Sequence, residues 1–373
     1  LTTLEIMNQQ RLERLQQEMT LRGLDGIVLM PGPNQVYFSG MHTHVSERPI
    51  LLFLPAADAP AVIIPTLEAM KAQAVGVPEE RIFAWNDEEW FEGAFARAAA
   101  TLKLTGAHWG VEALAMRVLE LETLHQVAPD LRTSHAEPAI MALRAIKDAD
   151  EIAAMEKAVA VAERAIEKLL PQIKIGQTEK QVAAMLNHLL MAEGADTVAF
   201  SPIISTGPNG ASPHAVPTDR ALADGDFLVI DWGAYVDGYP SDITRTFAVG
   251  HIDHEMARIY DVVRLANEQG KLAAKPGATG ADVDRAARDV IENAGYGSYF
   301  IHRTGHGLGL EVHEVPSMVA GNREPLAAGN VFTVEPGIYL PGRGGVRIED
   351  DVVVTADGRR SLTSFTRELI TVG

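Results

Sequence analysis

Apolar positions divide the chain into two parts with different patterns. In the first part, short apolar runs typical of buried strands alternate with segments of helical periodicity. The helix expected over residues 3 to 22 places Ile6, Leu12, Leu15 and Met19 on one face. This alternation predicts an α/β domain over residues 1–140. The strands are expected near 26–30, 49–54, 61–65, 81–85 and 108–112, and further helices near 66–74, 88–103 and 115–126.

The second part, residues 141–373, repeats one order of elements. A charged stretch near residues 144–151 opens a long helix to about Leu170, and Thr178 and Gln181 form a capping box that starts a second helix. A strand over 198–205 and a hairpin follow. Helices near 253–274 and 280–293, a Gly/His-rich segment and another hairpin then repeat this order. We interpret this part as two helix-helix-hairpin units, which makes the whole chain α+β; residue-level similarity between the units is faint.

The first hairpin carries two aspartates at facing positions. Residues 226–247 form two β-like runs around an Asp237-Gly238 turn signal. Asp231 and Asp242 have their midpoint about one residue from this turn, so they face each other directly or one diagonal step apart. That spacing corresponds to roughly 5 to 8 Å, close enough for two carboxylates to share a cation.

The second hairpin carries two glutamates in the same way. Glu335 and Glu349 are equidistant from Gly342 in the turn and stand beside the apolar residues Val334 and Ile348. Two acidic pairs in such surroundings repel unless they are protonated or bound to metal. The alternative, that an acid is a solvent-facing edge residue, explains any single acid better than it explains both pairs together.

Between the two hairpins lie three histidines within twelve residues, His302, His306 and His313. A zincin helix is excluded because Gly305 and Gly307 disfavour helix and Arg303 stands where the glutamate base is needed. A dinucleotide loop is disfavoured, since a β-like run follows the glycines instead of a helix. A single histidine of this kind is usually a core residue, but three beside two acidic pairs indicate ligand and acid/base groups.

Composition narrows the class of protein. The 373 residues contain 32 Lys+Arg against 50 Asp+Glu, a net charge of −18, which argues against nucleic acid or an anionic membrane as partner. The absence of cysteine excludes disulfides and thiolate ligands. Neither a signal peptide nor a spanning helix is evident, so a cytoplasmic location is expected.

The five acidic and histidine positions, in this order, resemble the pita-bread metallopeptidases: prolidase, aminopeptidase P, methionine aminopeptidase and the metal-free relative creatinase. The matching motifs are Gly-His306-Gly-Leu-Gly, Val-Glu335-Pro-Gly-Ile-Tyr and Gly-Val-Arg-Ile-Glu349-Asp, which follow Asp231 and Asp242. The preceding α/β domain is similar to that of prolidase, aminopeptidase P and creatinase. Creatinase replaces the metal ligands, whereas this chain keeps all five, so a metal-dependent hydrolase is favoured.

The resemblance implies two divalent metal ions. Asp231 binds one, His306 and Glu335 bind the other, and Asp242 and Glu349 bridge them. A ligand set of four carboxylates and one imidazole suits Mn²⁺, with Co²⁺ or Zn²⁺ as substitutes, and two such ions supply a bridging hydroxide near neutral pH. The resemblance also implies catalytic roles for Glu335 as proton shuttle and for three outer histidines, His214, His302 and His313. Arg347 orients a carboxylate or the substrate, or is only an ion-pair partner.

These features predict a dinuclear Xaa-Pro dipeptidase acting on a small peptide. Aminopeptidase P activity on longer peptides is the alternative, and a creatinase-like or other non-peptide amide hydrolase is a further one. A peptide-binding scaffold is disfavoured because no ligand is lost. A dipeptidase must recognise the substrate's free carboxylate, for which Arg48 is a candidate unless it pairs with Glu47 or lies on the surface. The resemblance also implies a homodimer.

Overall fold

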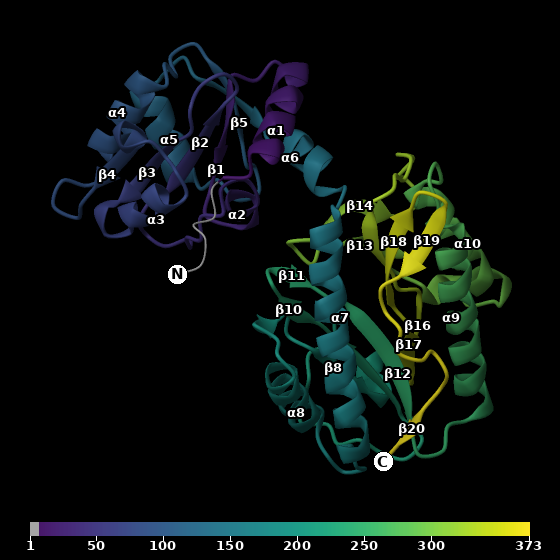
Figure 1. Cartoon of the computed structure of the whole chain (residues 1–373). Coiled ribbons are helices and arrows are strands. Elements are labelled where there is room, and N and C mark those ends of the chain that lie inside the picture. The colour runs from purple at the N-terminus through teal and green to yellow at the C-terminus, as the bar shows by residue number, and fades with distance from the viewer. Residues whose placement is uncertain (1–6) are drawn as a thin grey trace. The chain divides into compact units, whose positions relative to one another are not determined.

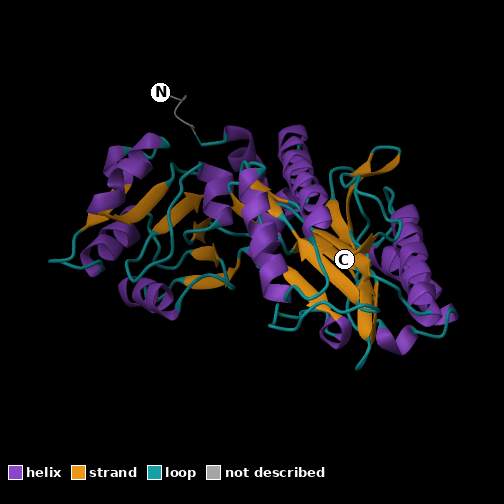
Figure 2. Cartoon of the chain, turned by 90° about the horizontal axis from the view of Figure 1, so that it is seen from below, coloured by secondary structure: helices purple, strands orange, loops and turns teal. Residues whose placement is uncertain are grey.

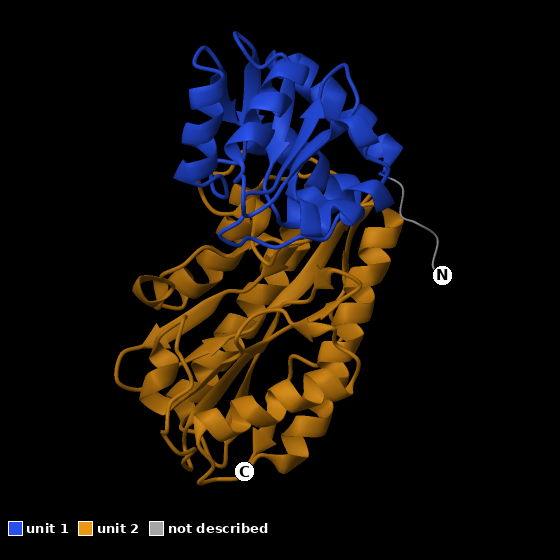
Figure 3. Ribbon diagram, turned by 90° about the vertical axis from the view of Figure 1, so that its left-hand side faces the viewer, with its two compact units in different colours: residues 1–144 blue, residues 145–373 orange. Residues whose placement is uncertain are grey.

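The chain divides into two compact units, Leu1–Arg144 and Ala145–Gly373 (Figure 3). A computed structural model describes residues 7–373, and Figure 1 shows the course of their elements. In each unit strands form the middle and helices lie around them (Figure 2). None of the helices in residues 7–373 has the length and apolar content that crossing a bilayer requires. Each unit buries a hydrophobic core of its own.

The first unit is built on a six-stranded mixed sheet of order β4-β3-β2-β1-β5-β6. β1 pairs with β2, and β2 with β3, in antiparallel fashion, whereas the remaining pairs are parallel. Every residue of β1, β2 and β3 is buried, as expected of continuous apolar runs in a sheet covered on both faces. The strands are β1 (Gly26–Leu29), β2 (Leu51–Pro55), β3 (Ala61–Pro65), β4 (Ile82–Trp85), β5 (His108–Val111) and β6 (Arg132–His135).

Within residues 7–144, six α-helices accompany this sheet: α1 (Gln9–Arg22), α2 (Pro33–Ser39), α3 (Ala69–Ala74), α4 (Glu92–Thr101), α5 (Val118–Val127) and α6 (Glu137–Arg144). In α1, Leu15 and Met19 are buried on the predicted face, while Ile6 lies outside the described residues. The sequence pattern did not predict α2, β6 or α6. α2 has only seven residues, too few to establish a period, and β6 is polar.

The second unit contains the two predicted helix pairs, α7 (Ala149–Leu169) with α8 (Glu179–Ala192), and α9 (His254–Ala273) with α10 (Gly280–Asn293). Within each pair the helices pack against each other, and Figure 1 shows α9 and α10 side by side. Asp148 and Asp253 cap the first helix of each pair, and Thr178 and Thr279 cap the second in capping boxes. These matching caps are a residue-level trace of the repeat.

In the first hairpin the two aspartates lie one diagonal step apart. Asp231 in β9 (Phe227–Trp232) is paired with Thr244 in β12 (Ile243–Val249), which places Asp242 two residues along the facing strand. The outer part of the hairpin, β10 (Ala234–Val236) and β11 (Tyr239–Pro240), keeps the same register. The single strand expected over 198–205 is instead two short strands in different sheets, β7 (Thr197–Val198) beside β10 and β8 (Ile203–Thr206) beside β9.

The second hairpin has the predicted register. Val334 of β15 (Val331–Val334) faces Asp350 of β18 (Asp350–Thr355), and Gly337 of β16 (Gly337–Leu340) faces Arg347 of β17 (Gly344–Arg347). Glu335 and Glu349 therefore stand opposite each other between these pairs. Pro336 has no N–H to donate at this point, and the expected continuous strand divides there into β15 and β16.

The Gly/His-rich segment forms a short strand, β13 (Gly305–Gly307), beside β14 (Glu314–Met318) and β15; β19 (Gly358–Ser361) and β20 (Thr371–Val372) follow near the end of the chain. A side chain at residue 305 would place its Cβ 1.8 Å from the Thr333 carbonyl oxygen, and one at residue 307 would place it 2.2 Å from that of Val315. The two glycines thus allow His306 to enter a closely packed sheet.

A buried carboxylate holds the second hairpin to the rest of the unit. Asp350 is fully buried and accepts hydrogen bonds from Arg245 (3.0 Å), Lys271 (2.7 Å) and Arg367 (2.5 Å). Burial alone raises the pKa of Asp350, but the three cations outweigh it and hold that pKa well below its usual range. This one carboxylate therefore ties β18 to β12, to α9 and to the segment before β20.

Replacing Asp350 with asparagine is expected to lower the free energy of unfolding by about 3 to 5 kcal/mol, because three buried or partly buried cations lose their charge partner. Urea denaturation followed by circular dichroism measures the change. Asp357→Asn, at an exposed turn residue, is the matched control and is expected to stay within about 0.5 kcal/mol of the wild type. Equal effects of the two substitutions would contradict a central role for Asp350.

Candidate metal centre

The second unit contains a cavity of about 580 Å³ that gathers the residues singled out from the sequence. All five predicted metal ligands line it, and so do the three outer histidines and Arg347. The cavity wall also includes Arg303 and several apolar side chains. The predicted residues in the wall are Asp231, Asp242, His306, Glu335, Glu349, His214, His302, His313 and Arg347.

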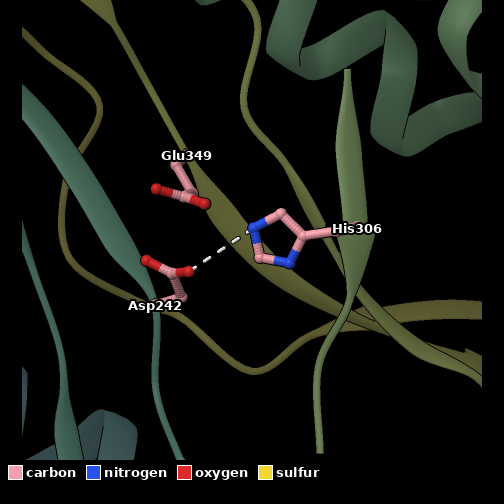
Figure 4. A group of neighbouring side chains, drawn as sticks. All are labelled: Asp242, His306 and Glu349. Carbon is pink, nitrogen blue, oxygen red and sulfur yellow. Dashed lines mark ion pairs between the residues drawn. The ribbon is translucent and has the colours of Figure 1, made fainter. Parts of the chain in front are cut away.

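Three of the expected ligands converge from different elements. Asp242 immediately precedes β12, His306 is the middle residue of β13, and Glu349 lies between β17 and β18. Figure 4 shows their side chains pointing toward one another, and one ligand atom from each lies within 4.8 Å of the other two. His306 Nε2 is 3.6 Å from Asp242 Oδ2 and 3.3 Å from Glu335 Oε1. This arrangement matches a cation site.

The protonation of His306 fits a metal ligand. Its Nδ1 lies 3.2 Å from the Gly307 carbonyl oxygen, which can only accept, so Nδ1 carries the hydrogen and Nε2 keeps a lone pair. Burial lowers the pKa of His306 to about 3, with a smaller contribution from His313, so the ring is neutral at pH 7. A neutral nitrogen lone pair that faces two carboxylates requires a proton or a cation between them.

The carboxylates around His306 also require a proton or a cation. Burial, together with the charges of neighbouring acids, raises the pKa values of Asp242 and Glu349 well above the usual range. Burial raises the pKa of Glu335 to about 7, although Arg347 acts against this shift. Asp231 Oδ1 is buried with no hydrogen-bond partner among the described residues. An unpaired acceptor and several repelling acids around one imidazole fit divalent cations with hard oxygen ligands.

Arg347 balances one of these acids. Its Nη2 donates to Asp231 Oδ2 at 2.6 Å, and its Nε donates at 3.0 Å to the Thr244 hydroxyl. That hydroxyl in turn donates to Glu349 Oε2 at 2.6 Å. Arg347 thus contacts Asp231 directly and reaches Glu349 only through Thr244. Sequence reasoning missed Thr244, because nothing in its local sequence marks a residue that links two strands.

His302 is held by hydrogen bonds on both ring nitrogens. Arg347 Nη1 can only donate, so the Tyr339 hydroxyl at 2.9 Å accepts from it and donates to His302 Nε2, also at 2.9 Å. His302 Nδ1 then donates to the Arg303 carbonyl at 2.7 Å. Burial lowers the pKa of His302 to about 4, with a further contribution from Arg347. Its direct contact with substrate stays a prediction and requires breaking one of these bonds. Tyr339 was not predicted from the sequence.

The two remaining histidines are exposed at the cavity. The His313 ring stands edge-to-face against His306, with centroids 4.3 Å apart, and burial and the nearby Arg303 charge lower the pKa of His313. His214 lies in the loop after β8. Both line the cavity, and their roles stay predictions.

Arg48 has partners within its own unit. Its guanidinium donates to both carboxylate oxygens of Asp87, at 3.0 and 2.7 Å, and to Glu47 at 2.7 Å. A role for Arg48 in binding the substrate carboxylate stays a prediction, and these contacts favour the alternative of a surface ion pair.

The stabilisation given by divalent metal is expected to increase with pH. In the metal-free folded protein the pKa of Glu335 is raised from the ordinary 4.5 to about 7. Between these two pH values the folded form therefore binds more protons than the unfolded chain. The metal-free protein consequently loses stability as the pH rises through this window. Bound cations replace those protons. The rise in Tm on adding Mn²⁺, measured by differential scanning calorimetry, should therefore be larger at pH 8 than at pH 5.5. A pH-independent rise would contradict this account.

Comparison with known proteins agrees with this geometry. A model of metallopeptidase family M24 matches residues 153–356, and one of the Creatinase/Prolidase N-terminal domain matches residues 11–146. The chain is 41% identical over 357 residues to the probable dipeptidase PepE of Mycobacterium tuberculosis, which covers 94% of this chain and 92% of that protein.

Two solved structures are similar over nearly the whole chain. Prolidase from Thermococcus sibiricus superposes with a TM-score of 0.92 at 36% identity, covering 97% of this chain and 98% of that one. An X-Pro aminopeptidase from Thermotoga maritima gives 0.85 at 32% identity, covering 97% and 99%. The resemblance and fold class inferred from the sequence are confirmed. The chain belongs to metallopeptidase family M24, with a Creatinase/Prolidase N-terminal domain ahead of its peptidase domain.

Proposed function

We propose that the protein is an Xaa-Pro dipeptidase that works with two divalent metal ions, Mn²⁺ by preference. Asp231, Asp242, His306, Glu335 and Glu349 hold them, since four carboxylates and one imidazole form a hard, oxygen-rich ligand set. The dipeptidase and prolidase names of its relatives support the proposal. The cytoplasmic location and the homodimer stay predictions.

The chain's own residues supply positioning and proton transfer. When bound, the metal ions supply Lewis acidity, which lowers the pKa of a water molecule and polarises the scissile carbonyl. Glu335, in the cavity wall with its Oε1 3.3 Å from His306 Nε2, is suited to accept a proton from the water and pass it to the leaving nitrogen. His313, exposed beside His306, is placed to donate to the oxygen of the tetrahedral intermediate.

One observation favours a dipeptidase: Arg303, in the cavity wall, forms no ion pair with a carboxylate of the described residues. Arg303 is half-buried in the cavity wall, and among the described residues no carboxylate lies within 4 Å of its guanidinium. Its hydrogen bond to the Ser317 hydroxyl is long, at 3.5 Å. In a chain with a net charge of −18, an unpaired arginine near the site is suited to the free carboxylate of a dipeptide.

Aminopeptidase P activity is the second candidate. The similarity to the structure of the Thermotoga maritima X-Pro aminopeptidase supports it. The two activities differ in where the substrate carboxylate lies. In a tripeptide the carboxylate lies one residue further from the scissile bond. A protein group that binds the carboxylate of a dipeptide therefore does not reach it.

Arg303→Gln is expected to raise KM for Ala-Pro by about 10- to 100-fold, because the substrate loses a charge-assisted hydrogen bond. KM for Ala-Pro-Ala is expected to change less than about 3-fold. Arg48→Gln serves as the matched variant, since sequence reasoning selected that arginine and the structure pairs it with Asp87. Steady-state kinetics with both peptides after loading with Mn²⁺ measures the difference.

Each outcome of this experiment assigns one role. A selective loss on Ala-Pro in the Arg48 variant alone would transfer carboxylate recognition to Arg48. Equal losses on both peptides in the Arg303 variant would exclude recognition of the dipeptide carboxylate. A wild-type enzyme that prefers Ala-Pro-Ala would replace the dipeptidase proposal with aminopeptidase P.

His313→Ala is expected to lower kcat by about 10² while the metal content stays near that of the wild type, because the ring donates to the transition state and is not a ligand. Atomic emission of the dialysed protein gives the metal content alongside the kinetics. A parallel loss of metal would instead make His313 a ligand.

A further inference from the structure

Glu179, the first residue of α8, is a buried carboxylate that serves the loop carrying His214. Its side chain is completely buried and accepts four hydrogen bonds. Oε1 accepts from the Thr206 amide at 2.7 Å. Oε2 accepts from the Asn209 side chain at 2.8 Å, and from the amide and hydroxyl of Thr218 at 2.8 and 2.6 Å. None of these donors belongs to α8 itself.

The donors lie at both ends of one segment. Thr206 ends β8 and Thr218 follows residue 217, so a single carboxylate fixes both ends of segment 207–217. His214 lies within this segment, and its ring makes no hydrogen bond with the described residues. The position of His214 at the cavity therefore depends on the backbone of segment 207–217.

The opposite side of segment 207–217 rests against the second hairpin. Arg347 Nη1 donates to the Pro213 carbonyl at 3.0 Å, one residue before His214. A Cβ at Gly345 of β17 would lie 2.2 Å from the Gly210 carbonyl oxygen, so glycine is needed for this close approach. The segment is thus held between Glu179 on one side and the strand that carries Arg347 on the other.

We propose that Glu179 is a positioning residue, whose four hydrogen bonds hold segment 207–217 closed and thereby place His214 against the substrate. This inference rests on the proposed peptidase function for its kinetic consequence. A carboxylate is needed because all four groups are donors and a carboxylate only accepts. Glutamine at this position keeps the shape but presents two N–H donors, so at least one of the four bonds is lost.

A double-mutant cycle between Glu179 and His214 tests the proposal. His214→Ala is expected to lower kcat/KM for the better of Ala-Pro and Ala-Pro-Ala by about 10-fold, as expected for one lost hydrogen bond to a charged group. Glu179→Ala should lower it by a similar factor in the wild type but by less than about 2-fold in the His214→Ala background. Additive losses would overturn the proposal, as would loss of bound metal in the Glu179 variant.

Three further variants complete the cycle. Thr218→Val, at an exposed residue, removes the 2.6 Å hydroxyl bond to Glu179 and the 3.1 Å bond that the same hydroxyl accepts from the Arg220 amide, and it keeps the Thr218 amide bond. It replaces Glu179→Ala if that variant does not fold. Glu179→Gln should recover part of the loss. Glu193→Ala, at an acid on the opposite end of α8 that pairs with Lys168 and Arg164, should combine additively with His214→Ala.

Hydrogen exchange measures closure of the segment without any substrate. Amides in segment 207–217 should exchange at least about 10-fold faster in Glu179→Gln than in the wild type, and at the wild-type rate in Glu193→Ala. If the wild type cleaves neither peptide, the proposed function fails, and the exchange result alone decides whether Glu179 closes the segment. Unchanged exchange in Glu179→Gln would overturn the proposal.

Discussion

The mutual repulsion of four carboxylates around one imidazole is the constraint on which the second unit depends. Asp231, Asp242 and Glu349 are buried, and Glu335 is nearly so. Their negative charges oppose one another in surroundings that screen them poorly. The cations they fit, together with Arg347, offset that repulsion. Both hairpins contribute acids to the wall of one cavity.

Two consecutive acids where β18 begins have opposite electrostatic surroundings. Glu349 points into the cavity, where burial and other acids raise its pKa. The next residue, Asp350, points the other way, where three cations lower its pKa. The alternation of side chains along a strand produces this separation. The charge of Asp350 is thereby compensated by protein cations, whereas the carboxylate of Glu349 stays available to a ligand in the cavity.

The sequence predicted local geometry well and distant partners poorly. The turn around Gly342 determined that Glu335 and Glu349 face each other, because the register of a hairpin follows from its turn. For Asp231 and Asp242 the sequence left a direct and a diagonal placement open, and the register of the structure is the diagonal one. Arg303 was noted only as a mismatch to another motif, since its lack of an ion pair is visible only in three dimensions. Nothing in the local sequence marks Glu179, because the three residues that donate to it lie 27 to 39 positions further along the chain.

The expected ligands extend from residue 231 to residue 349 and come from both hairpins and from the strand between them. A partly synthesised chain that ends before Glu349 lacks one ligand however well its first repeat has folded. The full set of expected ligands is therefore present only in the completed second unit, which bound metal would stabilise by mass action. In the cell, retention of metal would distinguish a finished molecule from a truncated one.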